Sequence, residues 1–319
     1  MSNLGEVLEG LRAGPLRRHG RLGCRPVYGR GEPGGWVPLA EALERGWVEV
    51  TEVSEEGSVN DLLIRNRGDR PVLALEGEAL VGAKQNRVLN LTILAGPGSE
   101  TEVPVSCVEA GRWAWRGRRF EADEAHLHPK ARTLLCRRVS ENYREGEPRA
   151  DQAEIWDEVA RKLDGMGVES GTADLLAARR RYQAQVDEAA SAFEPEADQV
   201  GVVFYLDGKP IGLEILGDPP TLAAYLPRLV RGYALDALEP GEPTVGLADS
   251  DFEDLVATLA EAAPERRPAV GLGEQWRIDA GPLVGSALVE GGRLVHLSAF
   301  VDGAPGGEGH GGRQGVLWR

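Results

Sequence analysis

The sequence has few cysteines, methionines and lysines, and these scarcities narrow the class of protein. The three cysteines, Cys24, Cys107 and Cys136, are odd in number and far apart. This spacing favours reduced thiols over a disulfide framework or a zinc knuckle. Only four of the 36 cationic residues are lysines, and there are two methionines and 20 prolines. Such a bias toward arginine is typical of a GC-rich source and compatible with heat adaptation.

Long apolar runs are also missing. No stretch approaches the ~20 apolar residues of a membrane helix, and residues 1–6 lack the basic-then-apolar order of a secretory signal. We therefore expect a cytoplasmic protein. The formal net charge of −15 at pH 7 repels phosphate backbones and acidic membranes, so we expect neither as a partner. A small anion is still compatible, because a local arginine and lysine cluster can outweigh a distant field.

The motifs of common nucleotide-binding and hydrolase folds are absent as well. No G-x-G-x-x-G fingerprint follows a strand, and neither a G-x-x-x-x-G-K-[ST] phosphate loop nor a G-x-S-x-G elbow occurs. We expect no cofactor.

What the sequence does contain is a group of unlike polar residues between two apolar runs, in residues 74–94. In the incoming run, period two places Val72, Ala74 and Glu76 on one face, as in a strand. The link between the two runs holds two carboxylates, two cations and two amides: Glu76, Glu78, Lys84, Arg87, Gln85 and Asn86. Because lysines and amides are scarce elsewhere, this grouping indicates a ligand site. The alternative is a hairpin whose charges pair with one another in solvent.

The strand-like residues 101–109 place Cys107 and Glu109 on one face. A cysteine in an apolar stripe is most often a small buried hydrophobe. A nucleophile would need a cationic neighbour, for which Arg112 is near in sequence. We expect Cys107 to be buried and unreactive, and Glu109 to join Glu76 and Glu78 as a candidate acid or base.

Residues 111–119 interleave tryptophans with arginines. Arg112, Trp113 and Trp115 form a combination that can stack a planar ring and hold phosphate oxygens. An arginine-rich loop capped by half-buried tryptophans explains the pattern equally well.

Two histidines, His126 and His128, have a metal-like spacing, with Glu121, Asp123 and Glu124 nearby. A proline follows directly and no third ligand recurs at a fixed offset, so we expect no metal site. We interpret His296, which shares a face with apolar residues, as a core histidine.

The order of the predicted elements indicates an α+β fold, in which an antiparallel β-rich N-terminal half packs on a helix-and-hairpin C-terminal half. We expect a solvated N-terminal arm at residues 1–24, the β-rich half at 25–145, the second half at 146–301 and a mobile glycine-rich tail at 302–319.

Local signals mark individual elements in the second half. Asp207-Gly208 predicts a type I′ hairpin, and a second hairpin is expected around Gly291-Gly292. Capping patterns predict helix starts at Asp151 and Ser250. A longer helix is expected to open at Thr172, and another is expected to kink or restart at Pro227.

Five segments carry a resemblance to a known family. In order they are Gly77-Glu-Ala-Leu-Val-Gly-Ala-Lys-Gln-Asn-Arg87, Val103-Pro-Val-Ser-Cys-Val-Glu-Ala-Gly-Arg-Trp113, Asp151-Gln-Ala-Glu-Ile-Trp-Asp157, Tyr233-Ala-Leu-Asp-Ala237 and Val295-His-Leu297. Over roughly residues 25–300 the chain resembles the bacterial family of ADP-ribosylglycohydrolase and rhodanese-phosphatase-superfamily-associated protein domains. The resemblance implies a role near ADP-ribose or phosphorylated nucleotide chemistry. The resemblance identifies no catalytic residue in this sequence.

Three hypotheses for function follow. The first is a binding or sensor module for an ADP-ribose-like or other phosphorylated nucleotide or sugar. In it Lys84 and Arg87 hold phosphate, Gln85 and Asn86 orient the ligand, and Trp113 or Trp115 stacks on it. The second is a hydrolase of such a molecule that uses one of the three candidate glutamates. The third is a scaffold for a protein partner; the oligomeric state is left open.

Overall fold

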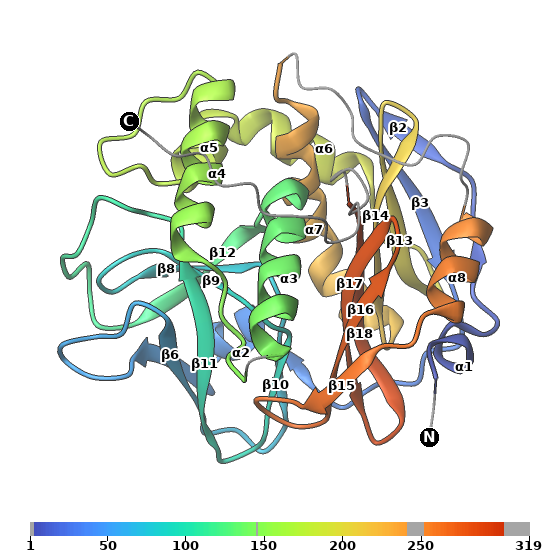
Figure 1. Cartoon of the computed structure of the whole chain (residues 1–319), viewed down its shortest axis with the longest axis horizontal. Helices are drawn as coiled ribbons and strands as arrows, with labels where there is room; N and C mark the ends of the chain where they lie inside the picture. The colour runs from blue at the N-terminus through green and yellow to red at the C-terminus, as the bar shows by residue number, and fades with distance from the viewer. Residues whose placement is uncertain (1–2, 145, 241–251, 303–319) are drawn as a thin grey trace, which may run out of the picture.

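A computed structural model describes residues 3–144, 146–240 and 252–302 of the chain (Figure 1). It confirms the α+β class, with an antiparallel β-rich N-terminal half. Among the described strands only β4 and β7 pair in parallel. The helices are α1 Leu4–Leu8, α2 Leu39–Glu44, α3 Pro129–Arg144, α4 Gln152–Gly165, α5 Leu176–Arg181, α6 Gln183–Ala192, α7 Pro219–Ala237 and α8 Phe252–Glu261. None of these helices is both long and apolar enough to cross a membrane.

The largest sheet of the described chain has nine strands. Its order is β1-β3-β13-β14-β18-β17-β16-β15, and β2 pairs with β3. The bounds are β1 Arg12–Ala13, β2 Arg17–His19, β3 Leu22–Tyr28, β13 Gln199–Leu206, β14 Lys209–Leu216, β15 Glu265–Pro268, β16 Glu274–Ala280, β17 Leu283–Glu290 and β18 Arg293–Val301. Helices α3 and α7 pack on one face of this sheet and α1 and α8 on the other, as Figure 1 shows. The sheet is therefore buried on both faces.

The first residues do not form the solvated arm that the sequence predicts. In α1, Leu4 and Leu8 are buried in the apolar cluster beneath α8. Strand β3 pairs along its length with β13, with Pro26 opposite Val202. This segment is ordered because its leucines complete the second face of the large sheet. The start of the chain is thus part of the sheet that the C-terminal half builds.

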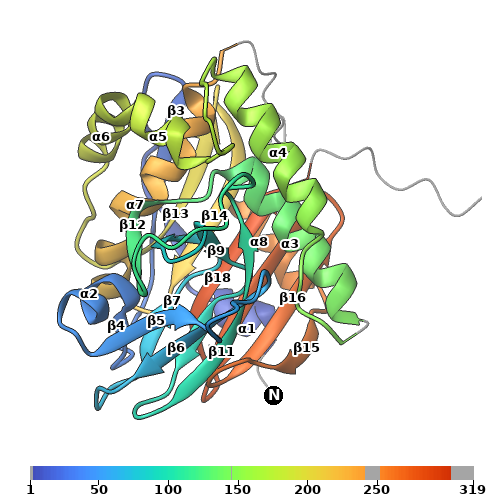
Figure 2. The ribbon, with the colours of Figure 1, turned by 90° about the vertical axis from the view of Figure 1, so that its left-hand side faces the viewer.

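A six-stranded sheet in the order β12-β8-β9-β11-β6-β5 faces the helices from the other side (Figure 2). Its strands are β5 Val48–Glu52, β6 Asp61–Asn66, β8 Glu78–Gly82, β9 Arg87–Leu89, β11 Glu100–Cys107 and β12 Phe120–His126. An isolated bridge between Thr51 and Arg119 brings the two edge strands, β5 and β12, together at one end. The sheet therefore curls toward a barrel but does not close.

Residues 74–94 form one long hairpin that is shared between two sheets. Its base is β7 Val72–Ala74 paired with β10 Ile93–Ala95, in a small sheet that β4 Val37–Pro38 completes. Its upper part is β8 paired with β9, in the six-stranded sheet. The hairpin breaks at Gly77, whose φ is 81°. A Cβ here would lie 2.8 Å from Arg132 Nε, so a glycine is required for two reasons.

The local signals in the second half have mixed outcomes. Positive φ angles at Asp207, Gly208, Gly291 and Gly292 confirm both hairpin turns. The Asp151 carboxylate accepts hydrogen bonds from two amides at the start of α4, as predicted. The Ser250 cap lies outside the described residues.

Two helix boundaries differ from the prediction. Helix α7 does not restart at Pro227 but continues through it, because its apolar stripe is held against the sheets on both sides of the proline. The helix expected from Thr172 begins at Leu176, after Asp174 Oδ1 accepts a hydrogen bond from the Leu176 amide, and breaks at Tyr182 into α5 and α6.

Candidate functional site

The tip of the central hairpin, residues 83–86, is buried under the connection between β11 and β12. Arg112 in that connection fastens the two together. Its guanidinium donates to Glu109 Oε2 at 2.8 Å, Ala83 O at 2.7 Å and Asn86 Oδ1 at 3.2 Å. It also reaches the carbonyl oxygens of Gly82 and Ala114, at 3.2 and 2.9 Å. One buried cation therefore holds the tip of the hairpin and the β11–β12 connection together.

Glu109 is the buried counterion of Arg112. Besides that ion pair, its carboxylate accepts hydrogen bonds from Thr172 Oγ1 at 3.0 Å and the Asn86 amide at 3.2 Å. Burial alone raises the pKa of Glu109, but these hydrogen bonds outweigh burial and lower it below its ordinary value. Glu109 is therefore an ionised, fully engaged carboxylate that positions the loops.

The two amides connect the tip to its surroundings. Gln85 Nε2 donates to Glu109 O at 2.9 Å, and Gln85 Oε1 accepts from Arg87 Nη1 at 3.0 Å. Asn86 Nδ2 donates to Asp174 Oδ1 at 3.1 Å. The sequence contains no signal for Thr172 or Asp174, because both reach the tip from residues far along the chain.

The outer side of the tip is built from cations and indole rings. Lys84 Nζ lies 5.1 Å from the Trp113 ring centroid and 5.0 Å from that of Trp115. The Arg87 guanidinium is 5.6 Å from the Trp113 centroid. The lysine and arginine side chains are buried, whereas Trp113 and Trp115 are 47% and 46% exposed. The indoles thus cover the cations and keep one face toward solvent.

Two buried polar atoms beside these rings lack a hydrogen-bond partner among the described residues. They are Arg87 Nε and Glu52 Oε2. The other oxygen of Glu52 accepts from the Lys84 amide at 3.3 Å. Burial lowers the pKa of Arg87, and the nearby Cys107 and Glu52 oppose that shift. We call Glu52, Lys84, Arg87, Trp113 and Trp115 the Lys84 cluster; Glu52 is a member that the sequence did not indicate.

The structure does not bring Glu76 and Glu78 to the Lys84 cluster. Glu76 is buried near the break of the hairpin, where its Oε2 accepts from Ser286 Oγ at 2.9 Å and from Arg277 Nη1 at 3.4 Å. Glu78 is the first residue of β8, at the opposite end of that strand from Lys84. Glu76 lies in the core with its neighbours Leu73 and Leu75, and its partners come from the C-terminal sheet.

A buried polar network beside Glu76 joins the small sheet to the large one. Thr92 Oγ1 accepts from the Glu76 amide at 3.1 Å and lies 2.7 Å from His296 Nδ1, whose ring Nε2 lies 3.0 Å from Glu214 Oε2. Arg132 forms an ion pair with Glu214. All of these side chains are buried, so His296 is a hydrogen-bonded core histidine.

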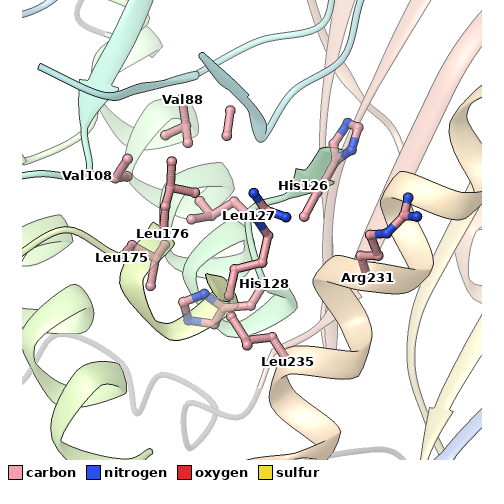
Figure 3. A pocket seen from close by; sticks show the side chains of 12 residues that line it. Val88, Val108, His126, Leu127, His128, Leu175, Leu176, Arg231 and Leu235 are labelled. Carbon is pink, nitrogen blue, oxygen red and sulfur yellow. The ribbon is translucent and has the colours of Figure 1, made fainter. Parts of the chain in front are cut away.

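The histidines near α3 lie apart. In Figure 3 the His126 and His128 rings are on different sides of Leu127. His128 Nε2 is 2.9 Å from Glu158 Oε1, while His126 packs edge-on against Tyr225. The cavity that both line has a volume of 20 Å³, which is too small for a nucleotide. In residues 3–144, 146–240 and 252–302 there is no group of three or more histidine, cysteine or acidic side chains arranged to hold a metal ion.

We expect the cysteines of the native protein to resist thiol reagents. Cys24, Cys107 and Cys136 are buried, and burial raises the pKa of Cys107 to about 11 and that of Cys136 to about 12. Titration with a chromogenic disulfide at pH 8 should therefore show little reaction until guanidinium is added, and then three thiols per chain. Fast labelling of native Cys107 would contradict the buried assignment.

The fold and the site together define an α+β protein with a buried cluster of cations, amides and a carboxylate beneath two half-exposed tryptophans. The chain belongs to the ARG and Rhodanese-Phosphatase-superfamily-associated Protein domain family, whose model matches residues 10–300. Comparisons with curated proteins and with solved structures found no match. The family match includes both the hairpin tip and the arginine-tryptophan connection.

Proposed function

We propose that the protein binds a planar, phosphorylated small molecule of the ADP-ribose or nucleotide type at the Lys84 cluster. The observation that carries this proposal is the contact of Lys84 Nζ with two half-exposed indole rings. A planar base stacks on such rings, and an ammonium beside them is a partner for phosphate oxygens. The resemblance to proteins associated with ADP-ribosylglycohydrolases supports the same ligand class.

The unpartnered atoms of the cluster support a polar ligand. Arg87 Nε is a buried donor and Glu52 Oε2 a buried acceptor, and buried groups of both kinds ordinarily have partners. A phosphate oxygen satisfies the first and a ribose hydroxyl the second. Gly57 packs against the cluster, since a Cβ there would lie 3.3 Å from both Glu52 Oε2 and Lys84 Nζ, and Lys84 Nζ donates a hydrogen bond to the neighbouring Glu56 carbonyl.

Binding is better supported than hydrolysis. Glu109 is occupied by Arg112 and Thr172, so it has no free oxygen for proton transfer. Glu76 and Glu78 are buried away from the cluster. A hydrolase at this site needs an acid or base that reaches the ligand. None of the three candidate glutamates is so placed, and the carboxylate that the cluster does contain is Glu52.

We expect replacement of both indoles, Trp113→Leu with Trp115→Leu, to weaken ADP-ribose binding about tenfold or more, because stacking on an aromatic ring contributes ~1–3 kcal/mol per base. Calorimetric titration with ADP-ribose, AMP and ribose 5-phosphate measures the change. The matched control is Trp47→Leu, since Trp47 also lies against a cation, with Arg45 Cζ 4.6 Å from its ring centroid.

Equal affinities in the double variant and the Trp47 control would refute the stacking role. If none of the three compounds produced heat of binding, the proposal that the Lys84 cluster binds this ligand class would be wrong. Release of product from ADP-ribose would establish the hydrolase instead.

A further inference from the structure

A groove of 430 Å³ opens between the two edge strands of the six-stranded sheet. It is bounded by the Thr51–Arg119 bridge, which joins β5 to β12, and by helix α2, which packs against β12. Its apolar lining includes Ala40, Leu43, Val48 and Phe120, and its charged lining includes three arginines and three glutamates. Its volume lies within the range of small-molecule sites.

Two of its three arginines form ion pairs with one carboxylate of the groove. Glu49 Oε1 is 2.7 Å from Arg119 Nε, and Glu49 Oε2 is 3.0 Å from Arg67 Nη2. The groove has two further carboxylates, Glu44 and Glu121. The third arginine, Arg228 of α7, differs. Its Nη1 donates to the Asp123 carbonyl. Its Nε and Nη2 have no hydrogen-bond acceptor among the described residues, and the side chain is partly accessible to solvent. Arg228 therefore offers free donors to the groove.

Two buried carboxylates, Asp123 and Glu78, lie near Arg228. Burial raises the pKa of Asp123, while Arg179, whose Nε is 3.0 Å from Asp123 Oδ1, and Arg228 oppose that shift. Asp123 thus has a cation of its own, whereas Arg228 is the cation beside Glu78. Glu78 Oε1 is 3.8 Å from Arg228 Nη1 and accepts no hydrogen bond from the described residues. The other oxygen of Glu78 accepts from the Leu75 amide at 3.1 Å. Arg228 thus lies between a buried carboxylate and a groove whose walls are partly apolar and partly charged.

We propose that this groove binds a small carboxylate with an apolar body, whose anionic head pairs with Arg228 and whose body packs on Leu43, Val48 and Phe120. Such a head and Glu78 compete for one guanidinium, so binding is coupled to uptake of a proton by Glu78. The site is separate from the Lys84 cluster and does not depend on the function proposed for it.

The direction of the pH dependence follows from the groups around Glu78. Burial raises the pKa of Glu78 to about 7, and Arg228 opposes that shift. His126 is its strand partner, and burial together with Arg132 and Arg228 lowers the pKa of that imidazole well below its ordinary value. Burial raises the pKa of Tyr225 well above its ordinary value. Between pH 6 and 8 Glu78 is therefore the group of this set that changes charge.

Octanoate is a suitable probe, with inorganic phosphate as an anion that lacks an apolar body. Above pH 7 an ionised Glu78 compensates Arg228, whereas below pH 7 it is protonated and the guanidinium is free for the ligand. If binding raises the pKa of Glu78 from about 7 by one unit, the affinity changes about fivefold between these pH values, so we expect octanoate to bind about fivefold more tightly at pH 6 than at pH 8. We expect phosphate to bind more weakly at both pH values.

Four variants test the proposal by calorimetry, each after a melt to confirm folding. Arg228→Gln should abolish octanoate binding, and Glu78→Gln should retain it but remove the pH dependence. Ala40→Phe adds bulk at a lining residue of the groove while leaving Arg228 in place, and should also block binding. The control is Arg231→Gln, one turn along α7, where Arg231 pairs with Asp187 at 2.7 Å and does not line the groove.

Binding that survives both Arg228→Gln and Ala40→Phe overturns the site. A pH dependence that persists in Glu78→Gln overturns the coupling, and equal affinity for phosphate and octanoate overturns the apolar part of the ligand.

Discussion

Replacement of Arg132 by alanine is expected to lower the free energy of unfolding by about 3–5 kcal/mol, because it leaves a buried carboxylate without its cation. Arg132 and Glu214 are both fully buried and form an ion pair. Without the guanidinium, Glu214 keeps only His296 and the Tyr233 hydroxyl, at 3.0 and 3.1 Å. Urea unfolding monitored by circular dichroism measures the loss.

Helix α3 itself supplies the matched control. Arg138 pairs with Glu154 and Glu141 at the surface, at 2.5 and 2.7 Å. An exposed pair contributes ~1 kcal/mol or less, so Arg138→Ala should change little. The double replacement Arg132→Met with Glu214→Gln should recover much of the loss, since neither charge is then stranded. Equal losses in the two single variants would show that the buried network does not stabilise the contact between the sheets.

Replacement of Arg112 by alanine should have the second large effect, and on two properties. Its five hydrogen bonds hold the tip of the hairpin to the tryptophan connection. We expect a loss of about 3 kcal/mol, because Glu109 is left buried and unpaired. We also expect ADP-ribose binding to disappear, since Trp113 and Trp115 lose the anchor that sets them over Lys84. Urea unfolding and calorimetric titration measure the two effects.

Arg118 is the control within the same connection. Its side chain is exposed, its contact with the Glu55 carboxylate spans 3.5 Å, and its guanidinium lies 6.0 Å from the Trp115 ring centroid. Arg118→Ala should therefore change the free energy of unfolding by ~1 kcal/mol or less. If Arg112→Ala behaved like Arg118→Ala in both measurements, the assignment of Arg112 as the anchor would be wrong.

Several features could be predicted from the sequence because they depend on neighbouring residues. Asp207-Gly208 and Gly291-Gly292 make hairpin turns, since aspartate and glycine tolerate positive φ. Asp151 caps a helix through amides two and three residues away. The polar tip of the hairpin also stood out, and Lys84 to Arg87 do lie together with Glu109 and Arg112.

Only the tertiary structure decided which of these groups share a site. Glu52 and Asp174 join the tip from distant parts of the chain, whereas Glu76 and Glu78, close to Lys84 in sequence, are bound by Arg277 and Arg228 from the second half. Helix α7 remains continuous at Pro227 because packing outweighs a lost hydrogen bond. Period and spacing report which way a side chain points, but ion pairing and burial depend on contacts between residues far apart in the chain. The sequence by itself therefore determined the turns, the caps and the polar tip, and the packing of the two sheets determined the partners of each charge.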